Sequence, residues 1–560
     1  MNRKVWSIVL FVVSLISFSG TGLVLAGGPE PGEGRAPIPA PVDQAASPAG
    51  TEDTYNTVIT VTSGTDPDDS SSKKCSTEPI CTLRRAIVDS RWLSAAQLPA
   101  LIQFDIPADP AEGYNSSLGV WEIEVHSTTD LWAFRRLKGQ VTIDGSSQPG
   151  GRGDGPKIIL IGPGTGQKTG LIVGDVAGDD EIVIRGLGMQ NFNPHITVNT
   201  DHNTVEDCWF GLSSDGSTLS SGVDTQPEGG SGVAAQETAD DNLIRNNKFA
   251  GFFGPAAAIR GNRNGFTGNQ VGMRADGTVP IPPGFDKHPC RGNTWAGGSG
   301  ITVSGDRHQI GGPNQADGNR FAGLYLDISE ESEPPFAIES RGTDDNNLIQ
   351  NNVIGLDADG GTIGICGRGI KLSGGPVGTQ VISNTIVETG LSAILMNDAI
   401  VGDRLNGNTL RGNVIRRERA WPEEQGDNTF PEAAIAYGAG VPDPLRNFTP
   451  ARITEIDGTS VSGTSGLGSD CPYCTIELFL DDQDTVVEAL ESLALVTADG
   501  DGDWTAALPA PLEEDQALRT MSTVPGDWTI TDLEEGTTSN LSVLYVEGYQ
   551  IFLPLVLRGF

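Results

Sequence analysis

The stretch NNLIQNNVIGLDADG, residues 346–360, decides the fold, because nearly the same pattern returns elsewhere at fixed internal offsets. With Asn347 as position zero, apolar residues stand at +2 and +7, Asn at +5, Gly at +8, and an Asp-Gly pair at +12 and +13. Copies with these offsets begin at Asn203 and Asn264, and a shorter copy begins at Asn242. We infer that the chain is built from repeated coils.

Each copy offers two short strands with a corner between them at +5. Strands this short cannot bury their apolar faces alone, so the coils must stack, with equivalent residues about 4.8 Å above one another. Side-chain amides at the +5 corner can then hydrogen-bond up the column as a ladder. The asparagines expected in this ladder are Asn247, Asn269, Asn352, Asn384 and Asn413. Cys208 takes the same slot in one coil, which predicts a buried, unreactive thiol.

The first residues predict export. Arg3 and Lys4 precede an apolar run over residues 5–18, and the small-residue exit that ends at Ala26 predicts a signal peptide, residues 1–26. The run is shorter than the roughly 20 residues of a spanning helix, so cleavage is favoured over a retained anchor. Residues 27–54 read as a Pro/Gly-rich linker. We expect an extracellular protein, secreted or associated with the cell surface, with no membrane span after cleavage.

The composition favours β-structure with many turns, because 74 of 560 residues are Gly and only 6% are aromatic. The 36 basic and 73 acidic residues give a formal charge of −37. A field of this sign repels nucleic acid and anionic membranes, so neither is expected as a partner. It also disfavours acidic polysaccharides unless cations or a local basic patch intervene. We expect a monomer.

Seven cysteines in an exported chain permit disulfides. Cys75 and Cys81 are close enough in sequence to clip one loop, and Cys471 and Cys474 could clip another. A redox or zinc site at the second pair is the weaker interpretation, because a strand rather than a helix follows and no second ligand pair appears. Pairing of Cys290 with Cys366 would explain the odd cysteine count.

The copies from Ile143 to Arg416 resemble the coils of right-handed parallel β-helix proteins in the pectin-lyase-like group. The segment from Cys81 to Ile87, Cys-Thr-Leu-Arg-Arg-Ala-Ile, resembles the Cys-Ser-Leu-Arg-Glu-Ala signature near the start of many exported bacterial β-helices, with Thr82 and Arg85 departing from it. A helix here would lay Leu83, Ala86, Ile87 and Ser90 on one face, over the open end of the first coil.

Beyond Pro450 the pattern changes to short strands separated by turns, as in a small β-sandwich. This part resembles the immunoglobulin-like modules of secreted bacterial proteins. The expected fold class is therefore all-β, a right-handed parallel β-helix (a single-stranded solenoid) followed by a small β-sandwich. The expected parts are a β-helix cap at 55–110, the β-helix at 111–450, an immunoglobulin-like sandwich at 451–546 and a tail at 547–560.

Four acids are candidates for catalysis: Asp201, Asp240, Asp241 and Asp345. The chain has the Asn-Thr-Asp and Asp-Asp pieces that polygalacturonases carry, but it has no Gly-His-Gly, and the segment from Arg368 to Lys371 has an extra Gly. The repeat explains the partial match better, because three of these acids stand two residues before a coil's first Asn and would form a surface column. Such a column could still hold Ca²⁺ or supply a general acid and base.

A basic stretch is unusual in so acidic a chain. Residues 242–275 contain no acid, and they contain Arg245, Arg260, Arg263 and Arg274 together with four Phe residues. These arginines could bind carboxylates or sulfates of a glycan while exposed rings stack on sugar faces. The alternative is that the rings belong to the core and that the arginines balance the acidic column.

The sequence thus predicts an exported protein that binds an extended polymer, a polysaccharide or cell-surface glycan, along its lateral face, as an adhesin or lectin would. The competing hypothesis is a polysaccharide lyase or glycoside hydrolase that acts on an acidic polysaccharide. The fold hosts enzymes and binding proteins alike, and because the polygalacturonase motifs are incomplete we expect a protein that is not an enzyme. No cofactor is expected, with Ca²⁺ as the one candidate ion.

Overall fold

The computed structural model describes residues 54–66, 73–126, 132–163, 168–217, 230–252, 254–279, 298–324, 334–343, 346–397, 407–417, 433–466, 471–484, 486–525, 533–546 and 549–551. The signal peptide, most of the linker, Cys290 and Asp345 lie outside these ranges. Within them, no helix combines the length and apolar character needed to cross a bilayer.

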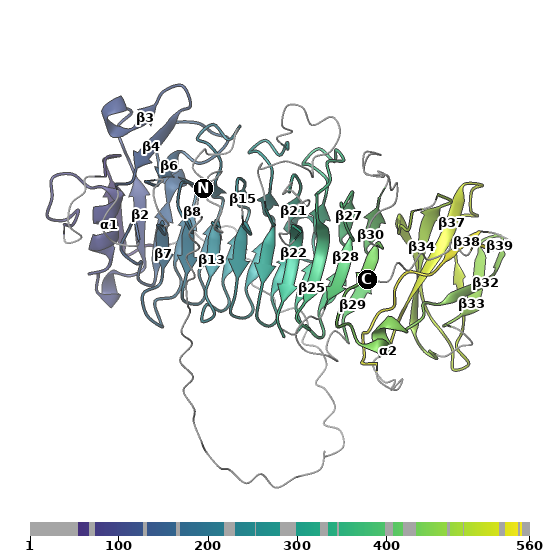
Figure 1. The fold of residues 1–560 in the computed structure, drawn as a ribbon. Helices are drawn as coiled ribbons and strands as arrows, with labels where there is room; N and C mark the ends of the chain where they lie inside the picture. Colours follow the sequence, from purple (N-terminus) through teal and green to yellow (C-terminus); the bar gives the residue numbers. More distant parts are fainter. Residues whose placement is uncertain are drawn as a thin grey trace, which may run out of the picture. The chain divides into compact units, whose positions relative to one another are not determined.

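Residues from Thr57 to Tyr437 form a right-handed parallel β-helix with three long sheets (Figure 1). Sheet 1 contains, in order, β1 (Thr57–Val61), β2 (Ala100–Phe104), β5 (Val141–Asp144), β8 (Val183–Arg185), β11 (Thr204–Glu206), β14 (Leu243–Arg245), β17 (Gly265–Thr267), β20 (Gln309–Gly311), β23 (Leu348–Gln350), β26 (Gln380–Ile382) and β29 (Thr409–Arg411). Because β1 and β2 pair in register with this sheet, the first rungs fall within the segment expected as a cap.

Sheets 2 and 3 complete each coil. Sheet 2 contains β3 (Tyr114–Asn115), β4 (Val120–Glu124), β6 (Ile158–Ile161), β9 (Leu187–Gln190), β12 (Trp209–Phe210), β15 (Lys248–Phe249), β18 (Gln270–Val271), β21 (Arg320–Phe321), β24 (Val353–Ile354), β27 (Thr385–Val387) and β30 (Val414–Arg416). Sheet 3 contains β7 (Leu171–Val173), β10 (Ile196–Val198), β13 (Val233–Ala235), β16 (Ala257–Ile259), β19 (Ile301–Val303), β22 (Phe336–Arg341), β25 (Arg368–Ser373), β28 (Ile394–Asn397) and β31 (Ile435–Tyr437). Neighbouring strands are parallel except β3 and β4.

The core consists of stacked columns of apolar side chains, one or two from each short strand. The +2 position of the repeat faces inward in every coil that carries it, and the stacked residues there are Val205, Ile244, Phe266, Ile310, Ile349, Val381 and Leu410. The +7 position supplies the rings of Phe210 and Phe249, which stack with centroids 5.0 Å apart. A strand of two or three residues buries its side chains only because identical strands lie above and below it.

The predicted +5 ladder is present as a continuous column of hydrogen bonds. The side-chain oxygen of Asn352 accepts the backbone N–H and the amide of Asn319 at 3.1 and 2.9 Å. Its own amide donates to Asn384 at 2.9 Å and to the backbone carbonyl of Ile310 at 2.9 Å. The same arrangement links Asn247, Asn269, Asn319, Asn352, Asn384 and Asn413, all buried.

Cys208 stands at the beginning of this ladder. Its backbone N–H donates to the side-chain oxygen of Asn247 at 2.9 Å, and its thiol is fully buried. Burial raises the pKa of the Cys208 thiol to about 12, which keeps it protonated. The thiol is therefore an unreactive core group, as its place in the repeat predicts.

A second ladder, at position zero, fills the corner between sheets 3 and 1. Asn203, Asn242 and Asn264 bond side chain to side chain at 3.0 Å. In the next coil His308 replaces Asn, and its Nδ1 accepts the backbone N–H of Asn264 at 3.2 Å. Its Nε2 contacts the carbonyl oxygen of Ser304 at 3.2 Å, so the neutral ring with hydrogen on Nε2 serves both contacts.

The Asp-Gly turns at the end of the repeat also stack. The backbone N–H of Ala275 donates to Gly216 at 3.0 Å, and that of Ala358 donates to Gly277 at 3.2 Å. In the copy at residues 346–360, the carboxylate that closes the turn is Asp357, which accepts the N–H groups of Asp359 and Gly361 at 3.1 and 2.6 Å. The repeat predicts Asp359 as the turn residue, and the structure uses Asp357, two positions earlier.

A helix, α1 (Leu83–Ser90), forms where the sequence predicts one, and it packs against the first strands, β1 and β2. Leu83, Ala86 and Ile87 are buried against the core of the β-helix. The Arg of the signature, Arg84, is fixed by a buried ion pair with Asp66 at 2.5 Å. A disulfide between Cys75 and Cys81 closes the preceding loop.

The other helical segments are short. They are η1 (Ala95–Gln97), η2 (Pro110–Glu112), η3 (Gly145–Ser147), η4 (Gln315–Asp317) and α2 (Asp443–Arg446). The last of these lies between the final strand of the β-helix and the C-terminal domain.

The C-terminal domain is a small antiparallel β-sandwich. One sheet contains β32 (Arg452–Asp457), β33 (Ser460–Thr464) and β36 (Asp503–Ala507). The other contains β35 (Glu491–Thr497), β34 (Thr475–Asp482), β37 (Gln516–Thr523), β38 (Leu544–Val546) and β39 (Tyr549–Ile551). The sequence did not predict β32 and β33, because their alternation of apolar and polar residues is weak.

Three further cysteines, in the β-helix and the sandwich, are disulfide-bonded. Cys471 and Cys474 form a disulfide directly before β34, where both residues are buried in the sandwich core. Cys366 is disulfide-bonded, and its expected partner, Cys290, lies outside the described residues.

The sandwich packs directly against the last coil of the β-helix. Ile415 and Ala489 exchange two backbone hydrogen bonds of 2.8 and 3.0 Å. The carboxylate of Glu477 accepts the backbone N–H of Gly412 at 3.0 Å, and Phe479 joins the core of the β-helix. An uncovered final coil would present unpaired backbone groups and an open core, so the sandwich serves as the second cap.

We predict that Asn352→Ala lowers the free energy of unfolding by about 3 kcal/mol, because it leaves buried partners above and below without hydrogen bonds. Urea denaturation of the full chain measures the effect. Asn447→Ala, at an exposed position outside the ladders, is the matched control and should change stability by less than about 0.5 kcal/mol. Equal effects of the two substitutions would contradict a structural ladder.

The His308 position also predicts a pH dependence. Burial lowers the pKa of His308, against hydrogen bonds that favour the charged ring, so the folded state prefers the neutral ring. A depressed pKa means that this contribution is present above the unfolded value of roughly 6.5 and is lost as the pH falls below it. We expect His308→Asn, which restores the ladder residue, to reduce the loss of stability between pH 7 and pH 5.

Thermal unfolding at several pH values checks this prediction. His202→Asn, at an exposed histidine, is the control and should retain the full pH dependence of the unchanged chain. Part of the dependence should remain in His308→Asn, because burial lowers the pKa of His195 to about 4. An unchanged pH profile in His308→Asn would argue against the ladder role.

Candidate functional site

A groove of about 610 Å³ runs across the outer face of sheet 3. The register of this sheet places Thr302 of β19 beside Ala258 of β16, and both side chains point outward because their neighbours along each strand are core residues. The residues that follow β16 and β19, together with the last residue of β22, also line the groove. The polar residues that line the groove are Glu237, Arg260, Asn262, Thr302, Ser304 and Arg341.

Two guanidinium groups dominate the charge of the groove. Arg260 follows β16 and Arg341 ends β22, so they stand two rungs apart, about 10 Å along the axis. Both residues are exposed, and among the described residues neither side chain forms an ion pair. Glu237 is the only acid in the lining. The groove is therefore a local cationic site in a chain with a formal charge of −37.

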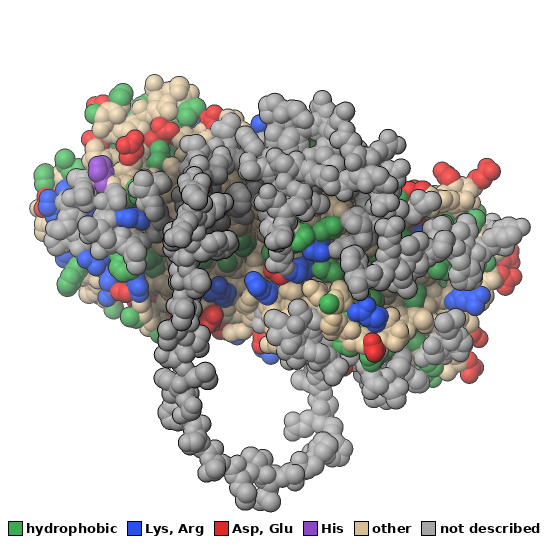
Figure 2. Space-filling view, viewed as in Figure 1, with side chains coloured by type: hydrophobic (Ala, Val, Ile, Leu, Met, Phe, Trp, Pro, Cys, Tyr) green, Lys and Arg blue, Asp and Glu red, His purple; other side chains and the backbone are tan. Residues whose placement is uncertain are grey.

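The side of the β-helix that carries β22, β25 and β28 faces the viewer in Figures 1 and 2. Lys and Arg side chains, drawn in blue, are spread along this face in the space-filling view. Cations spaced along a solenoid match a ligand that is itself extended and repeats its charges.

The floor of the groove requires a glycine. Gly305 has φ +117°, and a Cβ atom built on it would lie 1.5 Å from the backbone oxygen of Gly261. The backbone of the two successive corners therefore approaches more closely than any side chain permits. The carbonyl of the preceding residue, Ser304, is held by His308, so the second ladder supports this corner from below.

A buried ion pair lies beside the groove on the same outer face. Lys371 of β25 contacts Glu339 of β22 at 2.9 Å, and the hydroxyl of Ser373 donates to the same carboxylate at 2.7 Å. In the register of sheet 3, Glu339 is the neighbour of the groove residue Thr302. Both charged side chains are more than nine-tenths buried, so the pair is fixed in one geometry.

Two of the candidate catalytic acids, Asp201 and Asp240, lie in one column, and the described carboxylates have structural partners. Asp201 accepts the backbone N–H of Asp240 at 2.7 Å, and Asp240 accepts that of Asn262 at 2.8 Å. Asp241 is bound by Arg263 through two hydrogen bonds of 2.8 and 2.6 Å. The fourth candidate, Asp345, lies outside the described residues. This arrangement gives the acids a coil-linking role.

The structure does not bring the four candidate arginines together. Arg245 extends along sheet 1 and pairs with Glu206 at 2.6 Å, while Arg263 is occupied by Asp240 and Asp241. Arg274 lies in the Asp-Gly turn after β18. Of these four arginines, Arg260 is the one that lines the groove, and a role of the others in glycan binding stays a prediction.

The phenylalanines of the same stretch do not line the groove either. Phe249, Phe252 and Phe266 are buried in the core, and Phe253 lies outside the described residues. The sequence could not separate core rings from surface rings, because both alternatives satisfy the same spacing. For the three described rings, the core alternative is the correct one.

The sequence did not identify Arg341 as a groove residue, because its offset from the ladder differs from that of Arg260. Arg260 stands four residues before its ladder residue Asn264, but Arg341 stands six residues before Asn347. The extra residues at that corner break the offset, whereas the strand pairing restores the alignment.

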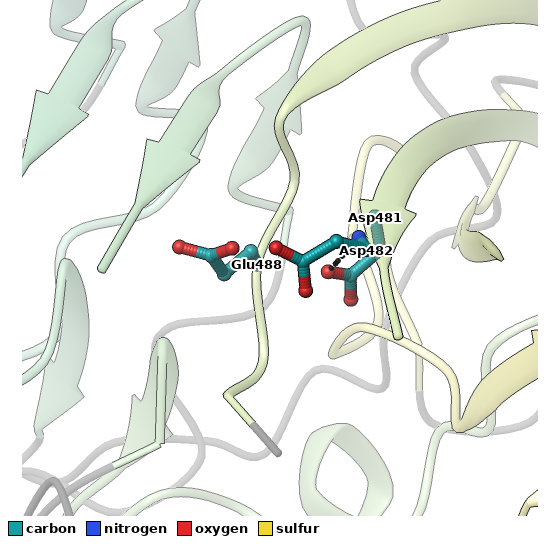
Figure 3. A group of neighbouring side chains, drawn as sticks. All are labelled: Asp481, Asp482 and Glu488. Carbon is teal, nitrogen blue, oxygen red and sulfur yellow. Dashed lines mark hydrogen bonds between the residues drawn. The ribbon is translucent and has the colours of Figure 1, made fainter. Parts of the chain in front are cut away.

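A group of acids at the end of β34 is the one place in the described part of the chain where three candidate metal ligands converge. Oxygen atoms of Asp481, Asp482 and Glu488 lie within 4.8 Å of one another (Figure 3). Oxygen ligands of this kind suit Ca²⁺, although the sequence placed its candidate ion on the other acidic column. One of the three, Asp481, is already engaged in a buried ion pair with Arg519.

A second cavity, of about 730 Å³, lies beside β4 near the N-terminal end. Its lining includes Glu122, Glu124 and His126, which alternate along one face of the strand, and Asp66. Asp66 is neutralised by Arg84, and the lining contains no Lys or Arg. The charge of this cavity is therefore opposite to that of the groove on sheet 3.

No protein-family model matches the chain, and no curated protein matches it. Among solved structures, it is similar to the A-module of the Azotobacter vinelandii mannuronan C-5 epimerase AlgE6, with 11% identity, a TM-score of 0.29, and coverage of 64% of this chain and 94% of that chain. It is also similar to the catalytic domain of a GH87 alpha-1,3-glucanase in complex with nigerose, with 11% identity, a TM-score of 0.29, and coverage of 68% and 66%.

A third similar structure is the full-length tailspike protein 2 of an Escherichia coli O157:H7 bacteriophage, with 11% identity and a TM-score of 0.26. The match covers 76% of this chain and 61% of that chain. At this degree of similarity, what these proteins bind or cleave says nothing about this chain.

We predict that Gly305→Ala destabilises the protein by about 3 kcal/mol or more, because the new methyl group collides with the backbone of Gly261. Gly360→Ala is the matched control: it has φ +82° and open space around the position, so it should cost only about 1–2 kcal/mol of left-handed strain. Denaturant unfolding measures both. Similar costs for the two variants would contradict the close approach of the corners.

Proposed function

We propose that this protein is an exported β-helix that binds an extended acidic glycan in the groove on sheet 3, without cleaving it. The observation that carries the proposal is the pair of exposed guanidinium groups, Arg260 and Arg341, two rungs apart in one groove. Guanidinium groups bind carboxylates and sulfates through paired hydrogen bonds, and neither Arg260 nor Arg341 is ion-paired within the described residues.

The rest of the groove supports a sugar chain as the bound polymer. Thr302, Ser304 and Asn262 add hydroxyl and amide groups next to the arginines, which is the chemistry that hydrogen-bonds to sugar hydroxyls. A rigid scaffold holds these groups, because the corner that carries Ser304 and Gly305 is tied to the second ladder. Preorganised polar groups lower the entropic cost of binding.

The hydrogen bonds of the candidate acids Asp201, Asp240 and Asp241 support a non-catalytic role. The carboxylates of Asp201 and Asp240 accept backbone N–H groups, and Asp241 is held by Arg263. General acid–base work needs a carboxyl group free to exchange a proton with the substrate. Export and a cell-surface location remain part of the proposal, on the strength of the N-terminal signal in the sequence.

Cleavage of the same polymer is the second candidate function. It is favoured by one observation, the exposed carboxylate of Glu237, which lines the groove together with Arg260 and Arg341. Incubation with acidic polysaccharides, followed by measurement of new reducing ends and of unsaturated ends, separates the two functions. Release of either product, with its loss in Glu237→Gln, would replace the binding proposal by an enzymatic one.

We predict that the double variant Arg260→Ala/Arg341→Ala loses retention on acidic polysaccharide by at least tenfold in apparent affinity, because both charged contacts are removed. Affinity electrophoresis in gels that contain polygalacturonate, alginate or a sulfated glycan measures it. Retention of the unchanged protein should weaken as salt rises, since the groove is open to solvent.

Arg416→Ala removes an exposed arginine of sheet 2 and is the charge-matched control for each single substitution. It should leave retention unchanged. If Arg416→Ala reduces retention as much as Arg260→Ala does, the interaction follows overall charge, and the groove proposal fails.

A further inference from the structure

The charged and neutral groups of the groove on sheet 3 follow a fixed order along the axis of the β-helix. Glu237 belongs to the coil of β13, and Arg260 belongs to the coil of β16. The coil of β19 contributes the hydroxyl groups of Thr302 and Ser304, and the coil of β22 contributes Arg341. Four consecutive coils therefore present an acid, a cation, neutral hydroxyl groups and a second cation.

Arg260, Ser304 and Arg341 stand in one column. Each comes directly after a buried residue of the paired strands β16, β19 and β22, so all three lie on the outer face. The backbone N–H of Ser304 donates to the carbonyl of Ile259 at 2.8 Å, which extends the pairing past the strand ends. The two arginines are therefore one rung on either side of Ser304, about 10 Å apart.

The groove has room for a sugar chain over these coils. In the neighbouring outward column, Ala258 and Thr302 are register partners, and their small side chains leave space above the sheet. The next partner in that column, Glu339, is a larger side chain that is fixed by its buried ion pair with Lys371. The lining ends with Arg341 of the same coil, so the groove spans four coils.

A linear glycan that lies along the axis meets these coils one after another. Consecutive pyranose rings of an extended chain are separated by nearly the same distance as consecutive coils, about 4.8 Å. One sugar therefore stands over each coil, and four sugars fill the groove.

We propose that the groove is selective for a linear glycan in which an acidic sugar alternates with a neutral one, an inference that rests on the proposed function. The acidic sugars lie over Arg260 and Arg341, and the neutral sugar between them lies over Thr302 and Ser304. The other neutral sugar lies over Glu237, whose carboxylate accepts a hydrogen bond from a sugar hydroxyl group. Each group of the groove then meets a complementary group of the ligand.

A glycan with an acid on every sugar fits the same groove less well. Its acidic group over the coil of β13 stands next to the carboxylate of Glu237, and like charges that face each other lower the affinity. Its acidic group over the coil of β19 finds hydroxyl groups in place of a guanidinium group. Glu237 is thus a specificity-determining residue that opposes the denser polymer, because specificity needs repulsion of the wrong ligand as well as attraction of the right one.

Affinity electrophoresis of the full chain in two polymers at equal carboxylate concentration tests the proposal. Hyaluronan carries a carboxylate on alternate sugars, and polygalacturonate carries one on every sugar. We expect retention on hyaluronan to be stronger by on the order of tenfold in apparent affinity. A hyaluronan tetrasaccharide should compete for the groove, and a disaccharide should not, because it reaches only one of the two arginines.

Rearranged charges give the sharpest comparison, because the composition of the chain stays the same. The double variant Arg341→Ser/Ser304→Arg sets the two arginines one rung apart. The double variant Gln236→Arg/Arg260→Gln sets them three rungs apart. Both should lose the preference for hyaluronan, and the one-rung variant should bind polygalacturonate at least as strongly as the unchanged chain does.

Glu237→Gln removes the repulsion and leaves both arginines in place. It should raise retention on polygalacturonate severalfold and leave retention on hyaluronan nearly unchanged, so the ratio between the two polymers falls. Glu455→Gln, at an exposed acid of β32 in the sandwich, is the matched control and should leave both retentions unchanged.

The proposed function and this inference fail in different ways. If retention on acidic glycans does not depend on Arg260 and Arg341, the proposed function fails, and the inference fails with it. If retention depends on both arginines but is equal on the two polymers, the glycan site stands and the alternating ligand is wrong. The same is true if the one-rung, two-rung and three-rung arrangements behave alike. Should a rearranged variant fail to fold, Glu237→Gln decides, because an unchanged ratio between the polymers contradicts the proposed selectivity.

Discussion

A hydrogen bond between coils, from a backbone N–H to a side-chain oxygen one rung away, is the interaction on which the rest of this β-helix depends. In the two ladders, the N–H of one coil donates to the Asn oxygen of the following coil, as from Asn203 to Asn242. In the acidic column the direction is reversed, and the N–H of Asp240 donates back to Asp201. At the corners, side-chain oxygens therefore accept buried backbone N–H groups that form no strand-to-strand hydrogen bond. These bonds also fix the rung spacing at about 4.8 Å.

This constraint also sets the surface. Because the rungs are locked in register, any residue type that recurs at one offset becomes a line of like groups along the solenoid. Acids at the corner are tolerated because each carboxylate is bound by a backbone N–H or by an arginine such as Arg263. The groove on sheet 3 differs from this pattern, since Arg260 and Arg341 meet no acid partner among the described residues, and this difference is the basis of the proposed glycan site.

Stacking leaves two open ends, and the chain closes them in different ways. The first coil is covered by α1, a short helix whose buried face joins the core directly. The last coil is covered by a complete domain, through backbone pairing and enclosed carboxyl groups such as Glu477 and Glu488. Burial of these carboxyl groups costs free energy unless they are hydrogen-bonded, and the backbone N–H groups of Gly412 and Arg417 supply these bonds.

The sequence by itself determined the coils, the ladder and the covering helix, because these follow from local spacing: Asn247 through Asn413 recur at one offset, and Leu83 to Ser90 show a helical apolar face. It also indicated the cystine bridges of Cys75 with Cys81 and of Cys471 with Cys474. Only the tertiary structure decided which arginines share a groove. Corner lengths vary from coil to coil, so Arg341 aligns with Arg260 through strand pairing and not through sequence offset. The sequence likewise did not predict that the sandwich covers the last coil. The bridge between Ile415 and Ala489 joins a repeat residue to a residue outside the repeats, so the repeat pattern does not predict it.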